Sequence, residues 1–212
     1  MSTTTECVYV RGTTAKRLRR AILDTMRARG LAFHGERQQG NPFTESPPPR
    51  PPQAREVSIL RHGRWFAIQS AALDEVDLWG KALSTSLERS VLAVWTWDGE
   101  AVLVASRWKG GVVRLKLQLP RERHRDGKGA LRAPARVLRP WLAPASRAKV
   151  LREGILLRDA IPGAEDDQDE FVSEEESLDA LLDAVGAPRQ QPFYMPGATR
   201  LTFVRSRTSA ST

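Results

Sequence analysis

Apolar and polar residues alternate most regularly between Val91 and Leu117, in the stretch VLAVWTWDGEAVLVASRWKGGVVRLKL. Two turn sequences, Asp98-Gly99 and Lys109-Gly110-Gly111, divide this stretch into three strands, because their residues tolerate the positive φ angles of tight hairpin turns. The third strand alternates strictly, so its two sets of side chains are expected to face the core and water respectively. The core-facing set is Val113, Leu115 and Leu117, and the water-facing set is Arg114 and Lys116.

A strand followed by a helix is predicted for residues 1–33. Residues 6–10 form a short apolar run, and Thr13 or Thr14 can cap the helix that comes next. Gly30 can close this helix in a left-handed conformation. The apolar positions recur at the three- and four-residue spacing of a helix with one buried face, and they are Ala15, Leu18, Ile22 and Met26.

Residues 34–55 read as a proline-rich, flexible loop with local polyproline II character. Six of the 14 prolines lie between Pro42 and Pro52. Proline lacks the backbone donor that a helix or a central strand requires. We therefore expect this segment to be an insertion between the N-terminal unit and the rest of the fold.

A hairpin and a second helix are predicted after this loop. Val57 to Ile68 reads as two strands joined by a turn at His62-Gly63. Asp74, Glu75 and Asp77 then suit the positive end of a helix. The apolar stripe of that helix consists of Val76, Trp79, Leu83 and Leu87.

The last third of the chain is less regular. After Pro120 the sequence is charged and broken by glycine, so it is expected to be a loop, and a short helix is possible within 141–153. Residues 163–172 read as an acidic loop. A clear helix follows, in which Ser173 and Glu176 form a capping box and Gly186 ends the apolar stripe. A final strand is expected at 199–205, followed by a disordered tail at 206–212.

This order of elements predicts an α+β fold: a mostly antiparallel sheet with helices packed on one face and a proline-rich loop insertion. A single α+β domain is expected, formed by the N-terminal unit at 1–33 together with residues 56–205. No run of 18 apolar residues is present, so no membrane insertion is expected. One cysteine and no secretory signal at the start of the sequence suggest a cytoplasmic protein.

The charge is strongly uneven along the chain. The formal net charge is +8, but residues 159–183 carry 11 acidic and no basic side chains, which leaves 33 basic against 14 acidic elsewhere. A basic surface invites nucleic acid as a partner. The densest basic stretch comprises Arg121, Arg123, Arg125 and Lys128, with Trp108 and Trp141 near it in sequence. Ordinary solvated arginines and core tryptophans explain the same pattern.

No set of residues at catalytic or metal-binding spacing is evident. His34, His62 and His124 lie far apart in a loop, a turn and a charged segment, and Cys7 alone cannot supply a thiolate set. The glycine-rich sequence at Asp126–Gly129 lacks the phosphate-loop pattern. We therefore expect a protein without cofactor or metal that is not an enzyme.

The segment Glu56–Leu117, with DLWGKALSTSLERSVLAVWTWDGEAVLV at its centre, resembles bacterial immunity proteins against polymorphic or contact-exchanged toxins, as in myxobacteria. The downstream FVSEEESLDALLDAVGAP and TRLTFVR are similar too. The resemblance implies a non-enzymatic protein that binds and neutralises a cognate protein toxin. Side chains suited to anchor such a partner are Arg107, Trp108 and Lys109 at a hairpin tip, or Asp166, Asp167, Asp169 and Glu170 in the acidic loop. Nucleic-acid binding is the alternative.

Overall fold

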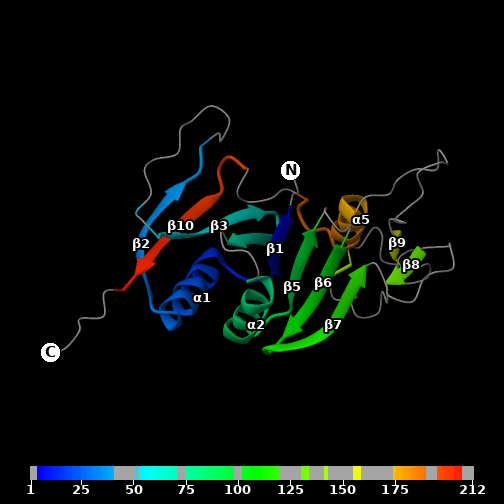
Figure 1. The fold of residues 1–212 in the computed structure, drawn as a ribbon, viewed down its shortest axis with the longest axis horizontal. Coiled ribbons are helices and arrows are strands. Elements are labelled where there is room, and N and C mark those ends of the chain that lie inside the picture. The colour runs from blue at the N-terminus through cyan, green and yellow to red at the C-terminus, as the bar shows by residue number, and fades with distance from the viewer. Residues whose placement is uncertain are drawn as a thin grey trace. The chain divides into compact units, whose positions relative to one another are not determined.

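The computed structural model describes residues 4–40, 51, 53–70, 75–97, 102–119, 130–133, 141–142, 155–158, 174–189 and 195–206. Figure 1 shows the fold. The first half contains β1 (Thr4–Arg11), α1 (Ala15–Ala28), β2 (Leu31–Gln38), β3 (Arg55–His62), β4 (Trp65–Ser70), α2 (Val76–Ser86) and β5 (Val91–Trp97). The second half contains β6 (Val102–Lys109), β7 (Val112–Leu119), β8 (Ala130–Ala133), β9 (Ile155–Arg158), α5 (Glu174–Val185) and β10 (Thr199–Arg205).

Eight strands form one hydrogen-bonded series in the order β2-β10-β3-β4-β1-β5-β6-β7, and β8 and β9 form a separate pair. Every pairing whose register is described is antiparallel. The predicted α+β class with an antiparallel sheet is confirmed. The last strand, β10, lies between β2 and β3, so the C-terminal end of the chain completes the sheet near its N-terminal strands.

The chain divides into two compact units. The first, which we call the α1–α2 unit, comprises Glu6–Ala93, Trp108–Val112 and Gln190–Thr212. The second, the α5 unit, comprises Met1–Thr5, Val94–Arg107 and Val113–Arg189.

In the α1–α2 unit both helices pack on the same face of the strands (Figure 1), as predicted. The two helices and the strands share one buried apolar cluster. The helices contribute Leu18, Ala21, Ile22, Met26, Trp79 and Leu83, and Leu87 follows directly after α2. The strands contribute Val8, Val10, Val57, Phe66, Ile68, Val91, Ala93, Trp108, Leu201 and Phe203. These helix positions recur at the spacing that the sequence pattern predicts.

Local signals begin and end α1 where the sequence places them. The Thr14 hydroxyl accepts a hydrogen bond from the backbone N–H of Arg17 at 3.2 Å, which satisfies one of the free donors at the helix start. Gly30 has a φ of 72° and turns the chain into β2. Of the predicted stripe, Leu18, Ile22 and Met26 are buried, whereas Ala15 in the first turn is exposed.

The opposite face of β1 and β4 is buried as well. Cys7 and Tyr9 of β1 are each 1% exposed, and Trp65 and Ala67 of β4 are also buried. These strands lie inside the series and are apolar on both faces, which is typical of central strands.

In the α5 unit, α5 ends at Gly186, whose φ is 66°. The backbone N–H of Ala187 donates to the carbonyl of Leu182 at 2.9 Å, and that of Gly186 donates to the carbonyl of Asp183 at 3.0 Å. This pattern satisfies carbonyls at the helix end. The buried stripe that the sequence predicts is present, and it consists of Leu178, Leu181, Leu182 and Val185; Ala184 is buried beside it.

Two predicted loops contain strands. His34–Gln38 was assigned to the proline-rich loop but forms most of β2, because β10 supplies a partner for these polar residues. Ala130–Ala133 was assigned to a charged loop but pairs with Ile155–Arg158 as β8 and β9. In both cases the pairing joins segments far apart in sequence, which periodicity along the chain does not detect.

Val113 also differs from the prediction. It was expected to face the core from β7, but its side chain is 39% exposed, and neighbouring Val112 is 50% exposed. Several other predictions lie outside the described residues: the Asp98-Gly99 turn, the prolines at 42–50, the acidic loop at 163–172, Ser173 of the capping box, most of the short helix at 141–153 and the tail beyond Ser206.

No helix in the described part of the chain is long and apolar enough to cross a membrane.

Candidate functional site: a hairpin tip held on helix α2

The β6–β7 hairpin turns at Gly110 and Gly111, which have φ values of 59° and 75°. These left-handed conformations explain why the turn contains two glycines. The tip lies against α2, since a Cβ added to Gly111 would meet the Thr85 hydroxyl at 2.7 Å and the Lys81 side chain at 3.8 Å. The predicted turn is confirmed, and its contact with the helix is an addition that the sequence did not indicate.

Ser84 joins the helix to the hairpin tip. Its hydroxyl accepts a hydrogen bond from the backbone N–H of Gly111 at 2.9 Å and donates to the carbonyl of Lys81 at 3.1 Å. Ser84 is completely buried. A buried hydroxyl that satisfies a turn N–H holds the tip in one position, because breaking the bond would leave the N–H without a partner.

Trp108 belongs to the same contact. Its indole ring packs on Gly80 so closely that a Cβ at Gly80 would lie 2.5 Å from Trp108 Cδ1. Trp108 is only 9% exposed and is part of the core cluster. Its ring therefore serves packing, and of the three side chains predicted at the tip it is the least accessible to a partner.

The exposed side chains around this contact form one surface. Leu78, Lys81 and Thr85 share the outer side of α2 at helical spacing and are all exposed. Lys109 and Val112 flank the glycine turn and are exposed too. We call these five residues the α2–hairpin surface. It presents two large apolar side chains, Leu78 at 41% and Val112 at 50% exposure, together with two lysines.

Arg107, the third side chain predicted at the tip, lies in the α5 unit and contacts a tryptophan. Its guanidinium carbon is 5.2 Å from the ring centroid of Trp141, a cation–π geometry. Burial lowers the pKa of Arg107 below its ordinary value, and the charge of Arg114 adds to this effect. Trp141 is 4% exposed, so this tryptophan is also used in packing.

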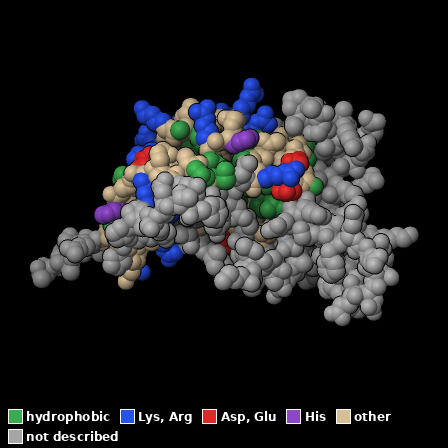
Figure 2. Space-filling view, turned by 90° about the horizontal axis from the view of Figure 1, so that it is seen from above, with side chains coloured by type: hydrophobic (Ala, Val, Ile, Leu, Met, Phe, Trp, Pro, Cys, Tyr) green, Lys and Arg blue, Asp and Glu red, His purple; other side chains and the backbone are tan. Residues whose placement is uncertain are grey.

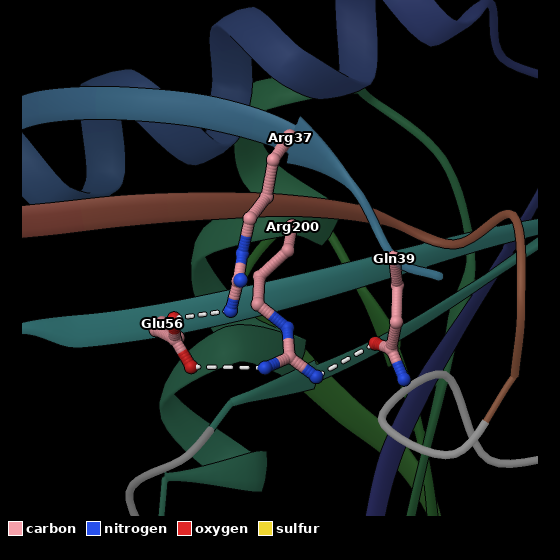
Figure 3. A network of polar contacts seen from close by, with 4 residues as sticks. All are labelled: Arg37, Gln39, Glu56 and Arg200. Atoms are coloured by element: carbon pink, nitrogen blue, oxygen red, sulfur yellow. Dashed lines mark hydrogen bonds and ion pairs between the residues drawn. The ribbon is translucent and has the colours of Figure 1, made fainter. Parts of the chain in front are cut away.

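A buried ionic network lies on the strands of the α1–α2 unit, and Figure 3 shows its four side chains. Glu56 of β3 contacts Arg200 of β10 at 3.3 Å and Arg37 of β2 at 3.4 Å. Arg200 also donates to the side-chain oxygen of Gln39 at 2.6 Å. The Glu56 side chain is 3% exposed and that of Arg200 is 8% exposed. A partner cannot reach the Glu56–Arg200 pair at the centre of the network, which joins strands β3 and β10, with Arg37 attaching β2.

A second ion pair ties α1 to the start of α2. Arg29 donates to Glu75, and Glu75 also accepts from the Ser70 hydroxyl at 3.3 Å. Burial opposes ionisation of Glu75, but the hydrogen bond and charge of Arg29 outweigh it, so the pKa of Glu75 is lowered. Glu75 was predicted to stabilise the start of α2, and the structure shows that it also links α2 to the end of α1.

Within the part of the chain that the structure describes, no group of three or more His, Cys, Asp or Glu side chains could hold a metal ion. Cys7 is 1% exposed, and burial raises the pKa of its thiol to about 12. A thiol in this environment remains protonated at neutral pH.

The remaining predicted binding residues cannot be placed. The basic residues Arg121, Arg123, Arg125 and Lys128, and the acidic residues Asp166, Asp167, Asp169 and Glu170, all lie outside the described residues. Of the predicted set, Arg107, Trp108 and Lys109 are described, and among these three only Lys109 is exposed.

The three residues that α2 contributes to the α2–hairpin surface were not identified from the sequence. Leu78, Lys81 and Thr85 lie outside the predicted apolar stripe of this helix and were given no role. Leu78 was the one available signal, because it is a large apolar residue outside the buried stripe.

No protein-family model, no curated protein and no solved structure matches the chain.

Proposed function

We propose that this chain is a non-enzymatic immunity protein that binds a cognate protein toxin through the α2–hairpin surface. The observation that carries the proposal is the exposure of Leu78 and Val112 beside Lys81 and Lys109 on a rigid base. Protein interfaces are anchored by apolar side chains at their centre and have charged residues around them.

The rigid base supports this proposal. The Ser84–Gly111 hydrogen bond and the packing of Trp108 on Gly80 hold the hairpin tip on α2 before any partner binds. A surface that is already ordered loses little conformational entropy on binding, which favours affinity. A complete interface of about 1,600 Å² would extend beyond these five residues.

The resemblance of Glu56–Leu117 to immunity proteins supplies the nature of the partner. That segment includes both α2 and the hairpin tip, so the resemblance and the exposed apolar residues concern the same part of the chain. The function proposed is inhibition by binding, for which the chain needs no reactive group of its own.

The test is co-expression of the chain with the product of its neighbouring gene, followed by affinity purification. We expect the pair to co-purify, and we expect L78D or V112D to weaken the complex by about tenfold or more, as loss of an interface anchor does. H34D is the matched control, since His34 is an exposed residue of β2 outside the surface. Circular dichroism would verify that each variant is folded.

The possible outcomes test the proposed function and the proposed binding surface separately. If the two proteins fail to associate, the proposed function is wrong. If they associate and both L78D and V112D bind as tightly as the unaltered chain, the α2–hairpin surface is not the binding site.

A further inference from the structure

Helix α1 presents an unusually basic outer face. Its exposed cations are Lys16, Arg17, Arg20 and Arg27, and its one acid is Asp24. The Arg20 and Arg27 side chains are 86% and 78% exposed. Asp24 contacts both of these arginines, at 3.8 Å and 3.2 Å, so a single carboxylate opposes the whole group. Figure 2 shows that Lys and Arg side chains also gather along one margin of the described surface.

Helix stability does not explain this arrangement. Lys16 and Arg17 lie in the first turn, which contains no acid, and positive charge there opposes the helix dipole. Lys16 and Arg20 are four residues apart, and Arg17 and Arg20 are three apart, so like charges face each other. Neither Lys16 nor Arg17 has an ion-pair partner within the described part of the chain. The helix therefore retains Lys16 and Arg17 at a cost to its own stability, whereas Arg27 in the last turn suits the helix dipole.

The character of this face discriminates among acidic partners. None of the large apolar side chains that are exposed in the described residues lies on α1, because the apolar residues of this helix pack into the core. Protein interfaces are usually centred on aromatic or Arg anchors set among apolar side chains, and a helix lying on a membrane requires an apolar face turned to the lipid; this face has no exposed large apolar or aromatic member. A face with four exposed cations and one acid suits the phosphate backbone of nucleic acid, which is bound mainly by Lys and Arg.

The nearest aromatic ring is not free to stack on bases. Phe33 of β2 is 43% exposed, but the Arg19 guanidinium lies 5.0 Å from its ring centroid. Arg19 is held there by Glu36, at 2.8 Å, and Phe203 meets the ring of Phe33 edge to face. Proteins that bind single strands rely on open aromatic faces. The duplex is therefore the form that this surface fits.

We propose that the outer face of α1 binds double-stranded nucleic acid through its phosphates, independently of base sequence. Lys16 and Arg27 are separated by about 16 Å along the helix axis. That length corresponds to about five phosphates of one strand. This activity is distinct from toxin binding and uses none of the residues of the α2–hairpin surface.

The test is fluorescence-anisotropy titration of a 20-base-pair DNA duplex between 20 and 200 mM salt, with the full chain. We expect the logarithm of the association constant to fall linearly with the logarithm of salt concentration. The double variant Lys16→Gln with Arg20→Gln should reduce the magnitude of that slope by about 1.8, since each lost phosphate contact contributes about 0.9. Affinity should fall on the order of tenfold per contact at 0.1 M salt.

The matched control is Lys81→Gln with Lys109→Gln, which removes the same charge from the α2–hairpin surface. We expect this control to bind duplex as the unaltered chain does. The proposal is overturned if the chain does not bind duplex at 20 mM salt, if the α1 variant binds normally, or if the control weakens binding equally. Tighter binding of a 20-nucleotide single strand, or displacement by polyglutamate at equal charge, would overturn the assignment to duplex phosphates.

Discussion

Glu56 and Arg200 form a buried ion pair although 144 residues separate them in the sequence, and their contact joins β3 to the last strand of the chain. Arg37 approaches the same carboxylate from β2. Since β10 lies between β2 and β3, one glutamate connects all three strands.

Replacing Glu56 with alanine is expected to lower the free energy of unfolding by about 3–5 kcal/mol, because it leaves the buried Arg200 guanidinium without its carboxylate. Denaturant titration of the purified variant measures this loss. Asp24→Ala is the control: it breaks exposed ion pairs of α1, which typically contribute about 0.2–1 kcal/mol. Equal effects of the two substitutions would show that the buried network does not hold the strands together.

Gly80→Ala is expected to destabilise the chain by about 1–3 kcal/mol, the usual range for an overpacked core. The added Cβ would lie 2.5 Å from Cδ1 of the Trp108 ring, which is too close for any real contact. In an exposed helix the same change would stabilise by up to about 1 kcal/mol, so the sign of the effect is informative. The comparison is Gly35→Ala, where the new Cβ meets nothing within 4 Å. A stabilised Gly80→Ala variant would contradict the packing of Trp108 on α2.

The Arg29–Glu75 pair predicts a specific loss of stability in acid. The pKa of Glu75 is lowered in the folded chain, so its contribution is fully present above the unfolded value of about 4.3. That contribution disappears as the pH falls through the lower, folded value. The stability difference between the unaltered chain and Glu75→Gln should therefore be largest at neutral pH, at about 1–3 kcal/mol, and vanish in strong acid.

Denaturant titrations from pH 2 to pH 7 measure this difference. Asp77→Asn is the control, because Asp77 is an exposed acid of the same helix. A difference for Glu75→Gln that stays constant over this pH range would mean that the charge of Glu75 is not what stabilises the contact.

Cys7 is expected to resist thiol reagents until the chain unfolds. Burial raises its pKa from 9.0 to about 12, so at pH 8 the thiolate fraction is on the order of a thousandfold lower than for an ordinary thiol. Alkylation followed by mass spectrometry, without and with denaturant, gives the two rates directly because the chain has one cysteine. Native labelling as fast as labelling in denaturant would place Cys7 outside the core.

Short-range patterns were sufficient for several elements. Thr14 caps the start of α1, and Gly30 follows its end in a left-handed conformation. Gly110 and Gly111 form the turn of the β6–β7 hairpin, also with positive φ angles. The stripe of α2 was correct because the 3.6-residue period of a helix places Trp79, Leu83 and Leu87 on one side whatever they pack against.

The candidate surfaces were predictable only in part. Lys109 was named from the hairpin sequence alone, but its association with Leu78 and Lys81 depends on the tip lying against α2. Trp108 is the converse case, since the sequence suggested an accessible side chain and the structure shows a buried one. A tryptophan near a turn resembles an interface anchor in sequence, and only its contact with Gly80 shows that the ring is buried.

By itself, the sequence determined α1, α2, α5, the β3–β4 and β6–β7 hairpins and the α+β class, because caps, turns and hydrophobic periods act over a few residues. Tertiary structure alone decided that β10 lies between β2 and β3, that the polar residues His34–Gln38 form a strand, and that Glu56 meets Arg200. The reason is physical: strand pairing and buried charge depend on which distant segment supplies the hydrogen-bond partner or the opposite charge, and a residue's neighbours along the chain do not specify that partner.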